Sequence, residues 1–214
     1  VNERAPRDNF FHCLVNAAHQ FHRRESNDDR YIIAGYPWFK CRARDTFISL
    51  PGLTLSIEED DYFELVMKTA MKGYYEFMEG KPVTVHIAEI DQPDVPLWAV
   101  WALQQYAKEK GKEACLKKYG KFIKDVVMYV KCNHHPNLKL MPNGLLYTDG
   151  KDKAVTWMNS TANGHPVVPR TGYIVEFNAL WYNALCFCAS LCELAGKEKD
   201  QQQFLEAAEL AKQS

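Results

Sequence analysis

An arginine and an aspartate stand side by side at Arg44 and Asp45, directly after an aromatic segment that includes Tyr36 and Trp38. A carboxylate accepts hydrogen bonds and a guanidinium donates them, so the pair can hold two neighbouring hydroxyl groups. Flat aromatic faces stack on the apolar faces of sugar rings. This grouping is typical of a saccharide subsite, although Asp45 taken alone also fits the N-cap of a helix.

A second group of polar residues follows later in the chain. The segment Thr-Trp-Met-Asn at 156–159 leads through Arg170 to Glu176, which opens an apolar stretch that does not otherwise need a carboxylate. Asn178 comes two positions later, so polar groups gather near the start of the helix expected there. A first-turn glutamate that stabilises the helix dipole is the structural alternative for Glu176.

The tryptophans are the third feature that could form a site. All five fall in or beside irregular stretches, or at the helix ends next to them: Trp38, Trp98, Trp101, Trp157 and Trp181. Mixed with Asp, Asn and Arg, they have the composition of a sugar-binding cleft. Tryptophans packed into the core are the other interpretation.

Helices are expected to position these groups, because apolar residues recur at spacings of three and four between Gly and Pro residues. We expect about seven helices, including ones near 7–24, after Asp45, at 58–80, at 94–110, from 112 to beyond 130, at 174–195 and at 198–212. Two stretches, 28–44 and 132–172, lack this pattern. A loop as long as the second usually carries function.

Composition excludes several classes of protein. The 214 residues carry 26 basic and 27 acidic side chains, a formal net charge of -1, so neither nucleic acid nor an acidic membrane is an expected partner. The longest apolar runs, 126–130 and 184–194, are shorter than the roughly 20 residues that span a bilayer. The seven cysteines are an odd number, and we expect reduced thiols, a cytoplasmic location and no bound metal. The chain is expected to form one domain, 1–214.

Five segments in a fixed order resemble those of bacterial and archaeal glycogen debranching enzymes. The first is AGYPWFKCRARDTFISLPGL at 34–53. The others follow in the family's order: QPDVPLWAVWALQQY at 92–106, NGLLYTDG at 143–150, TWMN at 156–159 and PVVPRTGYIVEFNALWYNAL at 166–185. Five ordered segments rich in Trp are far more specific than any one of them alone.

The resemblance implies an all-α (α/α)6 barrel, similar to glucoamylases and trehalases, that hydrolyses α-1,6-linked glucose in glycogen or maltodextrins without a cofactor. It also implies inversion, which requires a general acid and a general base roughly 6.5 to 9.5 Å apart. Arg44 and Asp45 would hold hydroxyls of the terminal glucose, and the Trp98 region would wall the subsite. The remaining substrate-binding candidates are Tyr36, Trp38, Asp94, Trp157, Arg170, Asn178 and Trp181.

Two departures from the family pattern affect the expected activity. The general acid of the family is the Asp of Thr-Trp-Met-Asp, and this position is Asn159, an amide that cannot donate a proton as a carboxylic acid does. Asp149, Asp152 and Glu176 are the substitute carboxylates. A complete barrel has twelve helices, so we expect the C-terminal helices to be missing, this piece to be inactive alone, and its open edge to allow self-association.

Two alternatives to a hydrolase remain open. The first is a non-catalytic glucan-binding module that retains the Trp and Asp contacts but has lost its acid at Asn159. The second is a helical scaffold for protein partners, which predicts tryptophans that are buried singly.

Overall fold

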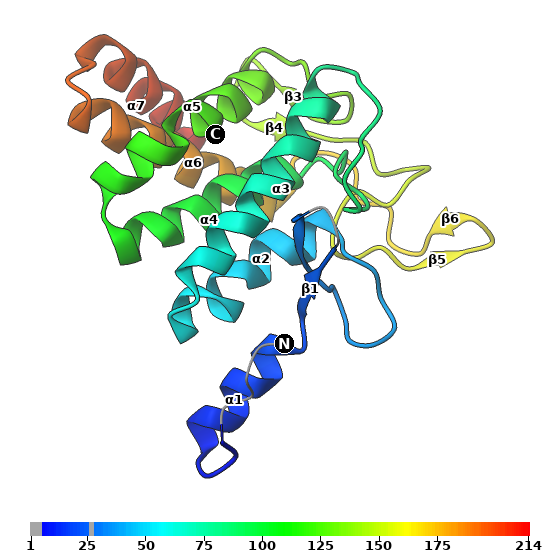
Figure 1. The fold of residues 1–214 in the computed structure, drawn as a ribbon. Coiled ribbons are helices and arrows are strands. Elements are labelled where there is room, and N and C mark those ends of the chain that lie inside the picture. The colour runs from blue at the N-terminus through cyan, green and yellow to red at the C-terminus, as the bar shows by residue number, and fades with distance from the viewer. Residues whose placement is uncertain (1–5, 26–27) are drawn as a thin grey trace. The chain divides into compact units, whose positions relative to one another are not determined.

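The computed structural model describes residues 6–25 and 28–214, and it is predominantly helical (Figure 1). The described residues form seven α-helices and three short antiparallel pairs of strands. The predicted all-α class and helix number are therefore confirmed. The chain divides into two compact units, Val1–Ile90 and Asp91–Ser214, each with its own core.

The first unit is built around two helices and a strand pair. Its elements are α1 (Phe10–His19), β1 (His22–Arg24), β2 (Arg30–Ile32), α2 (Ala43–Leu53), the 3-10 turn η1 (Leu55–Ile57) and α3 (Asp60–Met78). Asp60 and Asp61 stand in the first turn of α3, where negative charge is favourable, and Gly80 follows its end. The apolar stripe of α3 packs into the core with Phe47 of α2.

The prediction of one helix near 7–24 is wrong at its C-terminal end. Helix α1 starts after Asn9, whose side chain accepts from the backbone N–H of His12 at 2.8 Å, and it ends at His19. Arg24 instead lies in β1, which pairs with β2 in the register His22↔Ile32. The pairing satisfies the backbone of β2 while Ile32 is buried, a tertiary gain that helical periodicity does not reveal.

The second unit consists of two helix hairpins. They are α4 (Val95–Lys110) with α5 (Lys112–Lys131), and α6 (Val175–Leu194) with α7 (Glu198–Gln213). Gly111, with φ 92°, separates the first pair, and Gly196, with φ 64°, separates the second. Helix α6 also packs on α4 and α5, so it is the central helix of this unit.

The long segment between α5 and α6 contains two short hairpins. They are β3 (Lys139–Leu140) with β4 (Leu146–Tyr147), and β5 (Thr161–Ala162) with β6 (His165–Pro166). The β5–β6 pair is the yellow hairpin in Figure 1. Although the segment is irregular, it buries His135 and Thr148, so much of it is packed. No helix in the described ranges combines the length and apolar character needed to cross a membrane.

Candidate functional site

The best-defined polar arrangement of the second unit is a two-pronged ion pair between Arg170 and Glu176. Arg170 Nη1 donates to Glu176 Oε1 at 2.5 Å and Nη2 donates to Oε2 at 2.8 Å. Such a bidentate pair fixes the planes of both side chains relative to each other. Their side chains are 21% and 29% exposed, so the pair lies at the edge of the surface. The ion pair thereby ties the segment that precedes α6 to the first turn of that helix.

Arg170 also contacts the Thr-Trp-Met-Asn segment. Its Nη1 lies 3.4 Å from the sulfur of Met158, and the backbone N–H of Met158 donates to Thr156 Oγ1 at 3.1 Å. Thr156 is buried, while Trp157 is 63% exposed and Asn159 is also exposed. One guanidinium therefore links the residue before Asn159 to Glu176. Of the predicted site residues, Arg170 and Glu176 are therefore bonded to each other, with Met158 in contact with the same guanidinium.

The backbone of Arg170 is held by the segment around Gly150. A Cβ added to Gly150 would lie 2.3 Å from the carbonyl oxygen of Arg170, so only glycine allows this close approach. The Gly150 N–H donates to Thr171 Oγ1 at 3.0 Å, and that hydroxyl donates to Asp149 Oδ1 at 3.0 Å. Hydrogen bonds from the Lys151 backbone N–H and from Thr171 lower the pKa of Asp149. Asp149 is thereby held as a hydrogen-bond acceptor.

Asn178 joins the loop to α6 through its amide. Its Oδ1 accepts from the Leu146 N–H at 2.7 Å, and its Nδ2 donates to the carbonyls of Leu146 and Ile174, both at 3.1 Å. Trp181, one turn further, is buried in the core, with no hydrogen-bond partner for its Nε1 within the described ranges. The amide of Asn178 therefore supports the loop from inside the unit, while Trp181 belongs to the buried core.

Asp94 and Trp98 stand together at the start of α4. Asp94 is at the N-cap position and Pro96 follows within the first turn, as the sequence predicts. Trp98 Nε1 donates to Asp94 Oδ2 at 3.2 Å, and its ring meets Trp101 edge to face at 5.6 Å. The carboxylate thus orients the Trp98 ring, which remains partly exposed.

Arg44 and Asp45 lie in the first turn of α2, in the first unit. The N-cap position is Arg42, so Asp45 is not the cap residue. Arg44 is buried and Asp45 is partly exposed. Within residues 6–25 and 28–214, no hydrogen bond or ion pair engages the Asp45 carboxylate, which leaves its oxygens available to a ligand.

The aromatic loop, residues 34–40, immediately precedes this turn. The loop is closed by backbone bonds from the Ala34 N–H to Lys40 at 3.1 Å and from the Phe39 N–H to Gly35 at 2.8 Å. Its aromatic side chains point outward: Trp38 is 85% exposed and Tyr36 is 56% exposed. Exposed rings on a loop closed by its own backbone hydrogen bonds are suited to stacking on a ligand.

Comparison with known protein families decides which family the chain belongs to. The family described as amylo-alpha-1,6-glucosidase matches residues 15–214. The chain belongs to this family. Searches among curated proteins and among solved structures found no match. The family is glycogen debranching-related and contains glycoside hydrolases, so the chain carries a glucosidase-type domain.

Because the chain belongs to this family, the residue at the family's proton-donor position, Asn159, bears directly on the expected activity. The residue is exposed and stands where the resemblance places the proton donor. Of the three substitute carboxylates, Asp149 has a lowered pKa because of the hydrogen bonds that it accepts, and both oxygens of Glu176 accept from Arg170. Asp152 is exposed, and nothing in the described part of the chain bonds to its carboxylate.

The candidate residues are distributed over both units. Trp38 and Asp45 belong to the first unit, while Trp98, Trp157 and Glu176 belong to the second. Sequence reasoning missed Met158 and Thr171, which position Arg170 and Asp149. The only signal for them was their place within the Trp-Met-Asn and Arg-Thr-Gly segments.

Proposed function

We propose that this chain is the glucan-recognising part of an α-1,6-glucosidase that acts on branch points of glycogen or maltodextrins. In the complete protein the reaction is inverting hydrolysis in an (α/α)6 barrel, with two carboxylates and no cofactor. The observation that carries the proposal is the bidentate Arg170–Glu176 pair, bonded also to Met158. It joins two of the family-like segments at the start of α6.

The proposed roles combine the family resemblance with the exposure and bonding of the side chains. Trp38, Tyr36 and Trp157 stack on sugar rings, because their faces are exposed. In the first unit, Arg44 and Asp45 hold hydroxyls of the terminal glucose, as the resemblance implies. In the second unit, the Trp98 ring, oriented by Asp94, walls a sugar subsite.

Glu176 accepts from Arg170 through both oxygens, an arrangement suited to positioning rather than to proton donation. Asn178 and Trp181 take part by supporting the helix end beneath the ligand.

A second candidate is glucan binding without hydrolysis. Asn159 favours it, because the amide cannot protonate the leaving oxygen and two of the three substitute carboxylates are held as acceptors. The same aromatic residues would then retain glucan in the absence of chemistry. The two candidates share a ligand and differ in a single proton donor.

The test is the Asn159→Asp variant of the complete protein. General acid catalysis contributes typically about 10² to 10⁴-fold, so the variant should release glucose from an α-1,6-linked branch at least about tenfold faster than the wild type. A glucosyl fluoride, whose leaving group needs no proton, should gain little and serves as the matched substrate control.

If the wild type already hydrolyses the natural linkage and loses this activity as the pH rises, another side chain must donate the proton. That result would contradict the hypothesis that the proton donor is missing. Asp152→Asn would then identify the substitute acid, since it should abolish branch cleavage and spare the fluoride substrate. If Asn159→Asp gains no hydrolysis of the branch while glucan still binds, glucan binding without hydrolysis is the function.

A further inference from the structure

The first unit contains a cavity that none of the proposed glucan contacts lines. Its volume is about 440 Å³, and its walls are Arg23, Lys40, Cys41 and the segment from Val85 to Ala88. Pockets that hold small molecules usually span about 300 to 1,000 Å³. The cavity is therefore large enough for a ligand of the size of a substituted monosaccharide.

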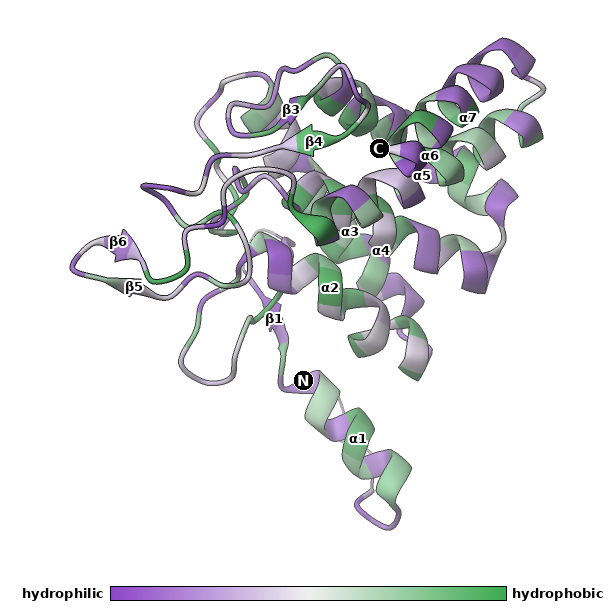
Figure 2. Cartoon of the chain, turned by 180° about the vertical axis from the view of Figure 1, so that it is seen from behind, coloured by the Kyte–Doolittle hydropathy of each residue, from purple (hydrophilic) through white to green (hydrophobic). Residues whose placement is uncertain are grey.

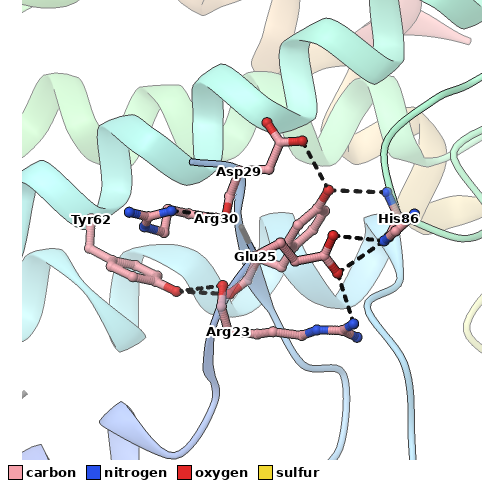
Figure 3. A network of polar contacts seen from close by, with 7 residues as sticks. Arg23, Glu25, Asp29, Arg30, Tyr62 and His86 are labelled. Atoms are coloured by element: carbon pink, nitrogen blue, oxygen red, sulfur yellow. Dashed lines mark hydrogen bonds and ion pairs between the residues drawn. The ribbon is translucent and has the colours of Figure 1, made fainter. Parts of the chain in front are cut away.

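Two of its basic side chains are fixed by one carboxylate. Glu25 Oε1 accepts from Arg23 Nη2 at 2.8 Å and from His86 Nδ1 at 2.9 Å (Figure 3). Tyr31 adds support, because its hydroxyl accepts from the His86 backbone N–H at 3.3 Å and donates to Asp29 at 3.4 Å. Glu25 thus orients Arg23 and His86 before any ligand arrives, which lowers the entropic cost of binding.

The charge of the cavity favours an anion. Arg23 donates to Glu25 and also bonds to the Cys41 thiol, which leaves further N–H groups of its five for a ligand. Lys40 has no ion pair within residues 6–25 and 28–214. With Glu25 counted, Arg23 and Lys40 leave one net positive charge. Because His86 directs Nδ1 at Glu25, its Nε2 is the ring nitrogen that remains for a ligand hydroxyl.

The rest of the wall is apolar. Val85 and Ile87 are nearly buried, and both line the cavity beside the basic groups. A ligand that combines an anionic head with a ring matches both halves of this lining.

Thiol chemistry is a poor use of the cavity. Burial raises the pKa of the Cys41 thiol above its ordinary value, and a nucleophilic cysteine needs the opposite shift. A noncovalent anion site fits the same residues better.

We propose that this cavity binds the phosphate monoester of a small sugar. Lys40 and the remaining donors of Arg23 bind the phosphate oxygens, which are strong acceptors of charge-assisted hydrogen bonds. The sugar ring lies against Val85 and Ile87, and His86 contacts a hydroxyl. No residue that lines the cavity is among the proposed glucan contacts.

Calorimetric titration of the full chain tests the site with three probes: glucose 6-phosphate, inorganic phosphate and glucose. Glucose 6-phosphate should bind more tightly than either of the other two. Lys40→Gln should weaken its binding about tenfold, the effect expected for one charge-assisted hydrogen bond. Lys81→Gln is the matched control, because Lys81 is an exposed lysine of the same unit outside the cavity, and it should leave binding unchanged.

The proposal is overturned if glucose 6-phosphate does not bind, if glucose binds equally well, or if Lys40→Gln binds it as the wild type does. Inorganic phosphate that binds as tightly as glucose 6-phosphate contradicts a sugar phosphate as the ligand. Glucan binding, measured on a His86→Asn sample because His86 lines the cavity but lies outside the aromatic loop, should be unaffected, which separates this site from the proposed glucosidase function.

Discussion

Two loops that carry candidate site residues are built in opposite ways. The segment between α5 and α6 is fastened by side chains, among them His135, Thr148 and Asn178, which bond to its backbone. The aromatic loop 34–40 is closed by its own backbone and directs Trp38 into solvent. Figure 2 shows hydrophobic residues along α1. Two of the hydrophobic residues of this helix, Phe10 and Leu14, are exposed.

The difference separates side chains that hold the backbone of the site in place from side chains that are proposed to contact the glucan. Fastened side chains stabilise the fold, so their replacement should reduce the free energy of unfolding. Exposed rings contribute little to folding, so their replacement should change binding alone. The predictions below test that division, from the largest expected effect on stability to the smallest.

Acid should weaken the long segment through His135. Burial lowers the pKa of this imidazole from 6.5 to about 4, and its Nδ1 accepts from the Asn137 N–H at 3.2 Å. As pH falls from 6.5 toward 4, the unfolded chain takes up a proton that the native chain does not, so stability decreases. The loss is about 1.4 kcal/mol per pH unit, roughly 3 kcal/mol in total, and it levels off below pH 4.

Urea unfolding at several pH values measures this loss. His135→Asn keeps an acceptor and removes the titrating ring, so the acid-dependent part should disappear. His165→Asn, at an exposed position, should leave the wild-type profile intact. Identical pH profiles for wild type and His135→Asn would contradict the assignment.

Asn178→Ala should destabilise the second unit by about 2 kcal/mol, because it removes three hydrogen bonds, two of them to Leu146. Asn178→Asp keeps the acceptor for the Leu146 N–H and loses the two donor contacts, so it should fall between alanine and wild type. Chemical denaturation measures both variants. An unchanged free energy of unfolding in Asn178→Ala would mean that the amide does not fasten β4 to α6.

The Arg170–Glu176 pair should show a coupling energy of about 1 kcal/mol in a double-mutant cycle with Arg170→Gln and Glu176→Gln, because both side chains are partly exposed. The Lys121–Asp125 pair on α5, with Lys121 83% exposed, is the matched control and should couple by less than about 0.5 kcal/mol. Equal coupling energies in the two pairs would mean that the Arg170–Glu176 pair is no stronger than an ordinary surface ion pair.

Trp38→Ala should change the free energy of unfolding by less than about 0.5 kcal/mol, because its ring is exposed. The same variant should weaken binding of a maltooligosaccharide about tenfold, since one stacked ring is lost. Phe10→Ala, an exposed aromatic outside the aromatic loop, should do neither. A large drop in melting temperature for Trp38→Ala would contradict this prediction and mean that the ring stabilises the fold.

Helix positions could be predicted because their signals are local. Asp94 with Pro96 starts α4, Gly111 separates α4 from α5, and Gly196 follows α6, all as the sequence indicates. The exception, Arg24, lies in a strand because its partner Arg30 forms the other half of a pairing that helical spacing does not encode.

Contacts within the candidate sites could not be predicted, because they join residues far apart in the sequence. The Asn178 amide reaches Leu146 across 32 positions, and His86 reaches Glu25 across 61. Residue types nominated Arg170 and Glu176 for a common site, yet only the fold reveals that they bond to each other. For Asn178 the sequence indicates a polar group near the helix end, and the structure assigns its amide to the loop backbone.

Titration of the chain with a branched maltooligosaccharide, followed by calorimetry and tryptophan fluorescence, tests the central claim that it recognises α-glucan through exposed aromatic residues. The account predicts saturable binding with a change in fluorescence, weakened about tenfold in Trp38→Ala and in Trp157→Ala. Absence of binding, or binding that neither variant alters, would contradict the account and favour a helical scaffold for protein partners.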